Sequence, residues 1–504
     1  MKNSISRRDF LKLAGMLPLG VAAPRLLDSL QAQTGKRNVI IVVFDALSAY
    51  DVSLYGFPRE TMPNLSRLAK RAVVYHNNYA GGNFTTTGTA SLLTGVLPWT
   101  HRAIQENSMV SPPFDKQNIF SAFPYYPIAY THNGWAYTLL RQFQTEIEEL
   151  IPREQLLLAS YDNIIPELFK NDDDIASVSW VRNMRARQDG FAYSLFLANL
   201  YEWLQAKKIE NLKELFPRGL PTTGSDNGFL LGEAVDFIAE RLSLIPQPFV
   251  GYFHFLPPHF PYRTSLEFYN VFKDDGFSLI EKPLDILIKN EDKNLLARRT
   301  GYDEFILYCD KEFARFYEQL EIAGLLENTW LVLTSDHGEM FERGISGHST
   351  DTLYEPVIRV PLVVFEPGRT EGMDIHIPTN NIDVLPTMLH VTGNPIPEWL
   401  EGTVLPPYST SPSDPNRSIF VMRANDNDPF APLTRASTMI LKDRYKLHYY
   451  FGYPQVPENG LIKLFDVQDN PEEMNDLYTV KKDTASELLN ELKAKLTEVN
   501  EPYL

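Results

Sequence analysis

Residues 38–44 constrain the fold most strongly, because they form a continuous apolar run, Asn-Val-Ile-Ile-Val-Val-Phe, with no polar alternation. A strand that is apolar on both sides must be covered on both faces, as in a parallel sheet. Residues 248–255 and 329–335 are similar runs, and segments with helical spacing, such as 63–72 and 302–323, lie between the runs. This alternation predicts a doubly wound α/β domain, a three-layer α/β/α sandwich.

The length of 504 residues allows one large domain or two. We predict a catalytic domain over residues 36–405 and a smaller C-terminal α+β subdomain over residues 406–504, with strands near 419–422 and 445–447 and a terminal helix. Residues about 140–215 are rich in charge and helical in period. They predict an inserted helical cap that borders the substrate site.

The N-terminus has the features of an export signal. Residues 6–12 read Ser-Arg-Arg-Asp-Phe-Leu-Lys and precede a short apolar stretch, residues 13–23. Paired arginines in this order predict a twin-arginine signal over residues 1–32, with the twin-arginine export machinery as partner. The alternative is a basic amphipathic helix. We expect a periplasmic or extracytoplasmic protein, which would be anchored in a membrane if the signal is retained; peripheral association with a membrane is the other form of contact considered.

The charge balance excludes one class of partner and suggests a cofactor. The formal net charge of −17 argues against binding to nucleic acid. An anionic substrate would then need a local positive centre, and a metal ion is the simplest one. Cys309 is the only cysteine, which excludes an intrachain disulfide and a zinc site built from several thiolates.

Three predicted strand ends carry polar residues: Asp45, Thr85 within the Gly-bounded loop 82–95, and the pair Asp336 and His337. If the strands are neighbours, these side chains converge where open α/β sheets bind ligands. The set predicts a site with four ligands for a divalent metal ion, with zinc or manganese preferred to calcium or magnesium. The metal would activate the Thr85 hydroxyl as a nucleophile. The alternative is that the loop is an ordinary helix cap.

Two loop histidines, His259 and His348, lie near these segments. We predict that they and Asn83 contact the substrate anion. Protonation of the leaving group and a second metal are alternatives for the histidines. His254 lies inside a predicted strand, which favours a packing role, and the pair His132 and Asn133 is a weaker candidate for facing the site.

The ordered motifs of the chain resemble those of the sulfatase branch of the alkaline phosphatase superfamily. The matching segments are residues 38–56, 90–95, 258–261, 334–339, 347–348, 353–355, 358–362, 382–387, 401–402, 464–466 and 469–473. The resemblance implies the sulfatase-like fold and an enzyme acting on anionic esters.

The chain departs from the formylglycine-type pattern at the nucleophile. Thr85 stands where those sulfatases have Cys or Ser, Thr89 stands at their arginine, and Ala46 follows Asp45 where they have a second acidic residue. A Thr nucleophile with Asp-His ligands is similar to lipoteichoic acid synthases, phosphoethanolamine transferases and phosphodiesterase relatives. The resemblance implies a hydrolase or transferase of phosphate esters, most of all diesters. The alternatives are a formylglycine-independent sulfuric ester hydrolase and a non-catalytic binding module.

Overall fold

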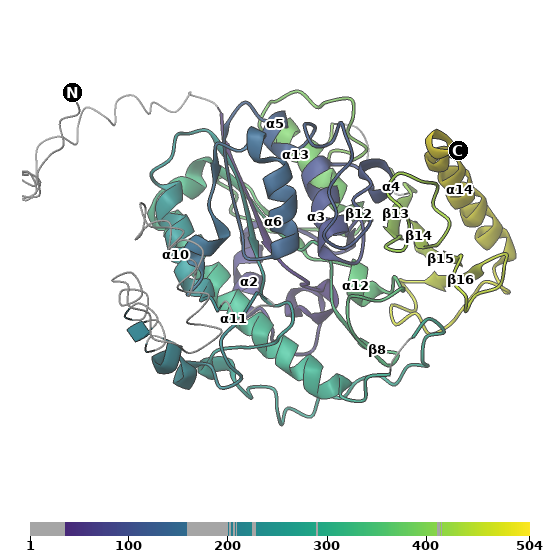
Figure 1. The fold of residues 1–504 in the computed structure, drawn as a ribbon, viewed down its shortest axis with the longest axis horizontal. Helices are drawn as coiled ribbons and strands as arrows, with labels where there is room; N and C mark the ends of the chain where they lie inside the picture. The colour runs from purple at the N-terminus through teal and green to yellow at the C-terminus, as the bar shows by residue number, and fades with distance from the viewer. Residues whose placement is uncertain are drawn as a thin grey trace, which may run out of the picture.

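The fold is built on an eight-stranded mixed sheet, seen in the computed structural model of the chain (Figure 1). The structure describes residues 36–158, 200, 203–204, 207, 209–223, 228–288, 291–410, 414 and 416–504. In sheet order the strands are β11 (Met373–Ile375), β2 (Val73–Tyr75), β10 (Leu362–Phe365), β7 (Thr329–Thr334), β1 (Asn38–Phe44), β6 (Phe249–Phe255), β4 (Tyr126–Thr131) and β5 (Glu149–Leu150).

The register of the central strands brings their C-terminal ends to one edge of the sheet. β1 lies between β6 and β7 and pairs in parallel with both. Val43 is opposite His254 on one side and Thr334 on the other. The residues that follow these positions therefore emerge side by side. β10 runs antiparallel to β7 and β2, so the sheet is mixed.

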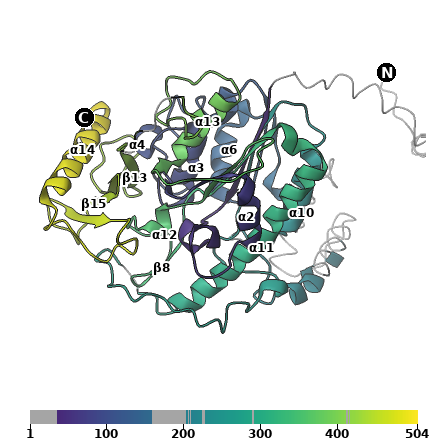
Figure 2. The same ribbon diagram turned by 180° about the vertical axis from the view of Figure 1, so that it is seen from behind.

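Helices cover both faces of the sheet, which confirms the predicted three-layer architecture (Figures 1 and 2). Alternate residues of β1 enter different cores: Val42 lies in one apolar cluster and Val43 in the other, both fully buried. One cluster includes residues of α2 (Pro63–Leu68), α10 (Leu231–Leu242) and α11 (Leu295–Ile322). The other includes residues of α3 (Thr85–Thr94), α5 (Ile119–Ala122), α6 (Gly134–Gln142) and α13 (Val384–Val391).

Short elements connect this frame. They are the helices α4 (Pro98–His101) and α12 (Glu355–Ile358), the paired strands β3 (Asn78–Tyr79) and β12 (Thr379–Asn380), and the hairpin of β8 (Met340–Glu342) and β9 (Ile345–Gly347). Among the described residues, no helix combines the length and apolarity needed to cross a bilayer.

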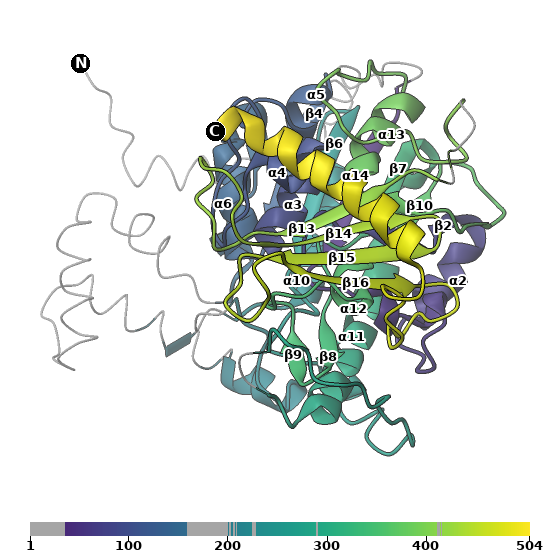
Figure 3. The same ribbon diagram turned by 90° about the vertical axis from the view of Figure 1, so that its right-hand side faces the viewer.

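The C-terminal part forms its own antiparallel sheet, as predicted (Figure 3). Its strands are β13 (Ile419–Arg423), β14 (Ala436–Lys442), β15 (Tyr445–Phe451) and β16 (Leu461–Asp466), and α14 (Lys482–Asn500) packs on one face. The other face packs against α12. Fully buried Lys446 pairs with Glu355 of α12 at 2.8 Å and with Glu473 at 2.9 Å, so ionic contacts also join this sheet to the catalytic part.

Two predicted segments fall partly or wholly outside the described residues. The signal segment 1–32 lies outside them, as do residues 159–199 of the predicted helical cap. The first part of that prediction is wrong, because Glu149 and Leu150 form β5 and pair in parallel with β4. The edge of β4 offers backbone hydrogen bonds that this segment uses, so it belongs to the main sheet.

Gly88 sets how closely α3 approaches β7. A Cβ placed on Gly88 would lie 1.9 Å from the backbone oxygen of Asp336, closer than any real Cβ contact. Glycine is therefore required here for packing rather than for its backbone angles. The close approach brings the first turn of α3 against the end of β7.

We predict that Gly88→Ala destabilises the protein, whereas the same change in an open helix is stabilising by about 1 kcal/mol. The clash with a backbone carbonyl should reverse that sign and lower the free energy of unfolding by about 2 kcal/mol or more. Urea unfolding followed by fluorescence measures the difference. Gly228→Ala is the matched control, because a Cβ there meets only ordinary contacts at 3.5 Å. Equal stability of the two variants would contradict the prediction.

Candidate active site

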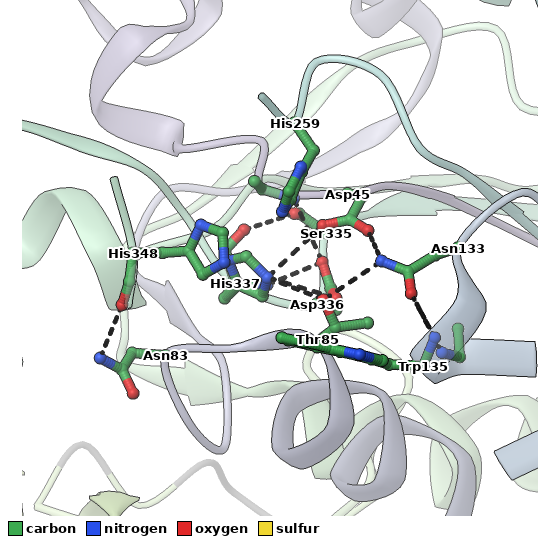
Figure 4. A network of polar contacts seen from close by, with 12 residues as sticks. Asp45, Asn83, Thr85, Asn133, Trp135, His259, Ser335, Asp336, His337 and His348 are labelled. Atoms are coloured by element: carbon green, nitrogen blue, oxygen red, sulfur yellow. Dashed lines mark hydrogen bonds and ion pairs between the residues drawn. The ribbon is translucent and has the colours of Figure 1, made fainter. Parts of the chain in front are cut away.

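The ends of β1, β6 and β7 and the start of α3 place a group of buried polar side chains at one point (Figure 4). Asp45 follows β1, His254 lies near the end of β6, and Asp336 and His337 follow β7. Thr85 is the first residue of α3. All five are fully buried. The convergence expected for Asp45, Thr85, Asp336 and His337 is thus observed, and His254 joins them.

Each aspartate uses one carboxylate oxygen in hydrogen bonds and leaves the other free. Asp336 Oδ1 accepts from the backbone nitrogens of Ala46 at 3.3 Å and His337 at 3.1 Å. Asp45 Oδ2 accepts from the Asn133 side chain. Within the described chain, Asp45 Oδ1 and Asp336 Oδ2 are buried without a hydrogen-bond partner. Such atoms are costly to bury unless a ligand or ion satisfies them.

The imidazoles of His337 and His254 are each hydrogen-bonded through Nδ1, which leaves Nε2 available to a ligand. His337 Nδ1 donates to the backbone oxygen of Gly338 at 2.9 Å, which leaves the lone pair on Nε2. His254 Nδ1 bonds the Tyr252 hydroxyl at 3.0 Å. His254 Nε2 lies 3.3 Å from Asp45 Oδ2 and 3.8 Å from Asp336 Oδ2. Outer contacts of this kind orient metal ligands.

The donor set fits a divalent cation. The ligand atoms of Asp45, His254 and Asp336 lie within 4.8 Å of one another. His337 Nε2 is 3.4 Å from Asp45 Oδ1 and 3.6 Å from Asp336 Oδ2. Burial, together with the charge of Asp45, raises the pKa of Asp336, whereas the pKa of Asp45 is lowered because the neighbouring histidines outweigh the effect of burial. Carboxylates and imidazoles are common ligands of divalent cations in proteins.

The Thr85 hydroxyl lies directly beside this cluster. Its Oγ1 is 3.3 Å from His337 Nε2 and 3.3 Å from Asn133 Nδ2. Phe84 before it is extended, so the chain turns into α3 at Thr85. The hydroxyl therefore sits at a helix N-terminus, where unpaired N–H groups and the helix dipole favour negative charge.

His348 lies next to His337, and His259 lies next to His348 (Figure 4). The ring of His348 is 4.2 Å from that of His337 and 4.9 Å from that of His259. Its Nδ1 contacts buried Glu339 at 3.2 Å, and burial raises the pKa of Glu339 to about 7. The structure brings both histidines to the site, while their contact with substrate stays a prediction.

Asn83 is not brought to the cluster, and Figure 4 shows it on the far side of His348. Its side-chain nitrogen donates to the backbone oxygens of His348, Thr350 and Thr352 at 3.2, 2.8 and 3.3 Å. That nitrogen is therefore occupied, and a contact between Asn83 and the substrate stays a prediction. Asn83 holds the loop that carries His348.

The sequence did not indicate His254 or Arg423, and it indicated Asn133 only as a weaker candidate. The packing role predicted for His254 is wrong, because its ring faces the two aspartates. Asn133 enters the site, while its neighbour His132 stacks on Phe229 at 4.1 Å. Arg423, from β13, pairs with Asp351 at 2.9 Å, and its positive charge is one of the influences that lower the pKa of His348. The β1–β6 register was the missing information for His254.

Comparison with known proteins finds sulfatases among the relatives of this chain. The family model described as "Sulfatase" matches residues 37–126 and 129–394, and that described as "N-sulphoglucosamine sulphohydrolase, C-terminal" matches residues 348–502. An ulvan-active sulfatase of Formosa agariphila is 24% identical over 92% of this chain and 81% of its own. A choline-sulfatase of Rhizobium meliloti is 24% identical over 88% of this chain and 83% of its own.

Solved structures show the same fold. The phosphonate monoester hydrolase of Agrobacterium radiobacter superposes with a TM-score of 0.64 at 18% identity, covering 93% of this chain and 96% of its own. The phosphonate monoester hydrolase of Silicibacter pomeroyi gives a TM-score of 0.63 at 19% identity, covering 93% of this chain and 96% of its own. With the family model matching well over half of its residues, the chain belongs to the sulfatase family of ester-hydrolysing enzymes, within the alkaline phosphatase superfamily.

Proposed function

We propose that this protein is a metal-dependent hydrolase of singly charged phosphorus esters, phosphodiesters above all, with Thr85 as the nucleophile. The observation that carries the proposal is the position of Thr85 Oγ1, 3.3 Å from His337 Nε2 at the edge of a cluster with two unpaired buried carboxylate oxygens. A hydroxyl so placed is set to attack an anion drawn to the cluster. Either water or an acceptor alcohol would then release the covalent adduct, so transfer is included in the proposal.

The residues divide the work by position. Asp45, His254, Asp336 and His337 would hold the metal, which when bound supplies Lewis acidity that favours the Thr85 alkoxide. The N-terminus of α3 adds a positive dipole at the same oxygen. His259 and His348 would contact the ester oxygens from the opposite side, with Glu339 holding the His348 ring.

The charges around Thr85 favour a singly charged ester. Within the described ranges, the side chains that hydrogen-bond Thr85 are His337 and Asn133, and neither is arginine or lysine. The carboxylates of Asp45, Asp336 and Glu339 would repel a doubly charged phosphate monoester more strongly than a singly charged ester. Phosphodiesters, phosphonate monoesters and sulfate monoesters all carry one charge.

A sulfate monoester is the second candidate, and the family comparison favours it. The two sequence relatives described above are named as sulfatases, and the two structural relatives are named as phosphonate monoester hydrolases. Phosphorus is preferred here because a threonine ester of phosphate is opened by in-line attack of water. The family's formylglycine chemistry has no counterpart at Thr85.

Export remains part of the proposal. It is supported by residues 6–12 and the apolar stretch that follows, both of which lie outside the described residues. Folded-state export would deliver the enzyme to the periplasm with its metal in place.

We predict that Thr85→Ala abolishes turnover of bis(4-nitrophenyl) phosphate, because it removes the hydroxyl that contacts His337 and Asn133 at the proposed attacking position. Thr85→Ser should retain a measurable rate, since it keeps the hydroxyl at the same helix terminus. Release of 4-nitrophenolate measures both, and circular dichroism checks the fold. Full activity of Thr85→Ala would disprove the assignment of the nucleophile.

We predict that His254→Ala lowers the bound metal and that His132→Phe does not. Both histidines are fully buried, but only His254 faces the aspartates, whereas His132 stacks on Phe229. Plasma mass spectrometry of the purified proteins measures the metal per chain. Chelation of the wild type should lower its melting temperature, because the two carboxylates lose their compensating charge. Equal metal content in the two variants would contradict the placement of His254.

We predict the order of kcat/KM on four 4-nitrophenyl substrates at equal metal. The bis-ester of phosphate and the phenylphosphonate ester should be fastest, the sulfate ester slower, and the doubly charged phosphate monoester slowest. A sulfate ester that exceeds both phosphorus esters would select the second candidate. A fastest phosphate monoester would contradict the charge argument for both candidates.

A further inference from the structure

Asn133 is held with one defined orientation of its side-chain amide. It is the N-cap of α6, and its Oδ1 accepts from the backbone nitrogens of Trp135 at 2.7 Å and Ala136 at 3.2 Å. Both partners are donors only, so the atom that faces them must be the oxygen. The cap therefore fixes the identity of the opposite atom as nitrogen.

That nitrogen points into the active site (Figure 4). Asn133 Nδ2 donates to Asp45 Oδ2 and lies 3.3 Å from Thr85 Oγ1. An amide nitrogen has two N–H groups, one for each of these oxygens. The side chain is only 7% exposed, so solvent does not compete strongly for these contacts.

The two contacts at Thr85 Oγ1 respond differently when the hydroxyl loses its proton. His337 Nε2 offers only a lone pair, because Nδ1 donates to Gly338, so whether it accepts the hydroxyl proton or binds the metal it donates no hydrogen bond to a deprotonated Oγ1. Asn133 donates to the oxygen itself, and a hydrogen bond to a charged acceptor is stronger than one to a neutral acceptor. The Asn133 contact therefore strengthens as negative charge develops on Oγ1.

We propose that Asn133 is a further catalytic residue, a fixed hydrogen-bond donor that stabilises negative charge on Thr85 Oγ1. The inference rests on the proposed function of Thr85. In the first step Oγ1 bonds to the central phosphorus or sulfur and its proton passes to solvent, while the bond to the leaving oxygen breaks and that oxygen departs with the electron pair. In the second step water or an acceptor alcohol bonds to that atom, loses a proton, and Oγ1 leaves with its bonding pair and regains a proton.

Asn133 acts on both steps because Oγ1 carries charge in each. A neutral amide does not exchange a proton with Oγ1, so its contribution is electrostatic. Its orientation is set before substrate binds, by the cap of α6, and no reorganisation is needed during the reaction. The same amide also holds Asp45, which ties the nucleophile to one aspartate of the cluster.

The substitution Asn133→Ser removes the hydrogen-bond donor to Thr85 but keeps a residue that can cap α6. Serine caps a helix about as well as asparagine, so stability should be preserved, but its short hydroxyl has no second group that reaches Thr85. We expect kcat on bis(4-nitrophenyl) phosphate to fall about 10²-fold, the usual effect of losing one donor to a developing oxyanion, with KM little changed. Asn133→Asp keeps the shape and the cap but replaces the donor with a carboxylate, and should be slower still.

Asn118→Ser is the matched control. Asn118 caps α5 in the same way, accepting from the backbone nitrogens of Phe120 at 3.0 Å and Ser121 at 3.4 Å. Its side-chain nitrogen donates to the backbone oxygen of Asp115. The variant should match Asn133→Ser in melting temperature and wild type in kcat.

Bound metal is measured in every variant, so that kcat is expressed per metal ion. A fall in kcat per metal with unchanged melting temperature supports the donor role. Wild-type kcat in Asn133→Ser or Asn133→Asp overturns it. A loss of metal that accounts for the whole loss of activity also overturns it, because Asn133 would then act only through Asp45. Failure of the Thr85 assignment is seen separately, as full activity in Thr85→Ala.

Discussion

The parallel pairing of β1 with both β6 and β7 is the constraint on which the site depends. Because Val43 is opposite His254 and Thr334, the chain segments that follow β1 and β7 leave the sheet at the same level. Asp45 and Asp336 are thereby brought together from positions far apart in sequence. A shift of one residue would turn each strand's side chains to the opposite face of the sheet and disperse the cluster.

The two buried carboxylates belong to a cluster in which each side chain is held by a hydrogen bond at the atom that faces away from the centre of the cluster. Asp336 is held by two backbone amides, Asp45 by Asn133, His337 by Gly338 and His254 by a tyrosine hydroxyl. The inner atoms then point at one another, an arrangement that a divalent cation stabilises and that its absence leaves repulsive. The fold supplies pre-organisation for the metal in this way.

Thr85 reaches the cluster through helix packing instead of strand pairing. Gly88 lets α3 lie against the backbone of Asp336, and Thr85, one turn earlier, faces His337. The family architecture is thus retained around Thr85, the proposed nucleophile. The C-terminal sheet adds a cation, Arg423, whose Nη1 is buried without a hydrogen-bond partner in the described part of the chain.

The sequence by itself determined the three-layer α/β fold, the residues that end the central strands, and the family, because apolar runs and local motifs are properties of short segments. For that reason the sequence was enough to identify Thr85, Asp45, Asp336 and His337. Strand order, register and the approach of α3 depend on contacts between distant segments, which no local pattern encodes. Only the tertiary structure could therefore bring His254 and Asn133 into the site and turn Asn83 away from it.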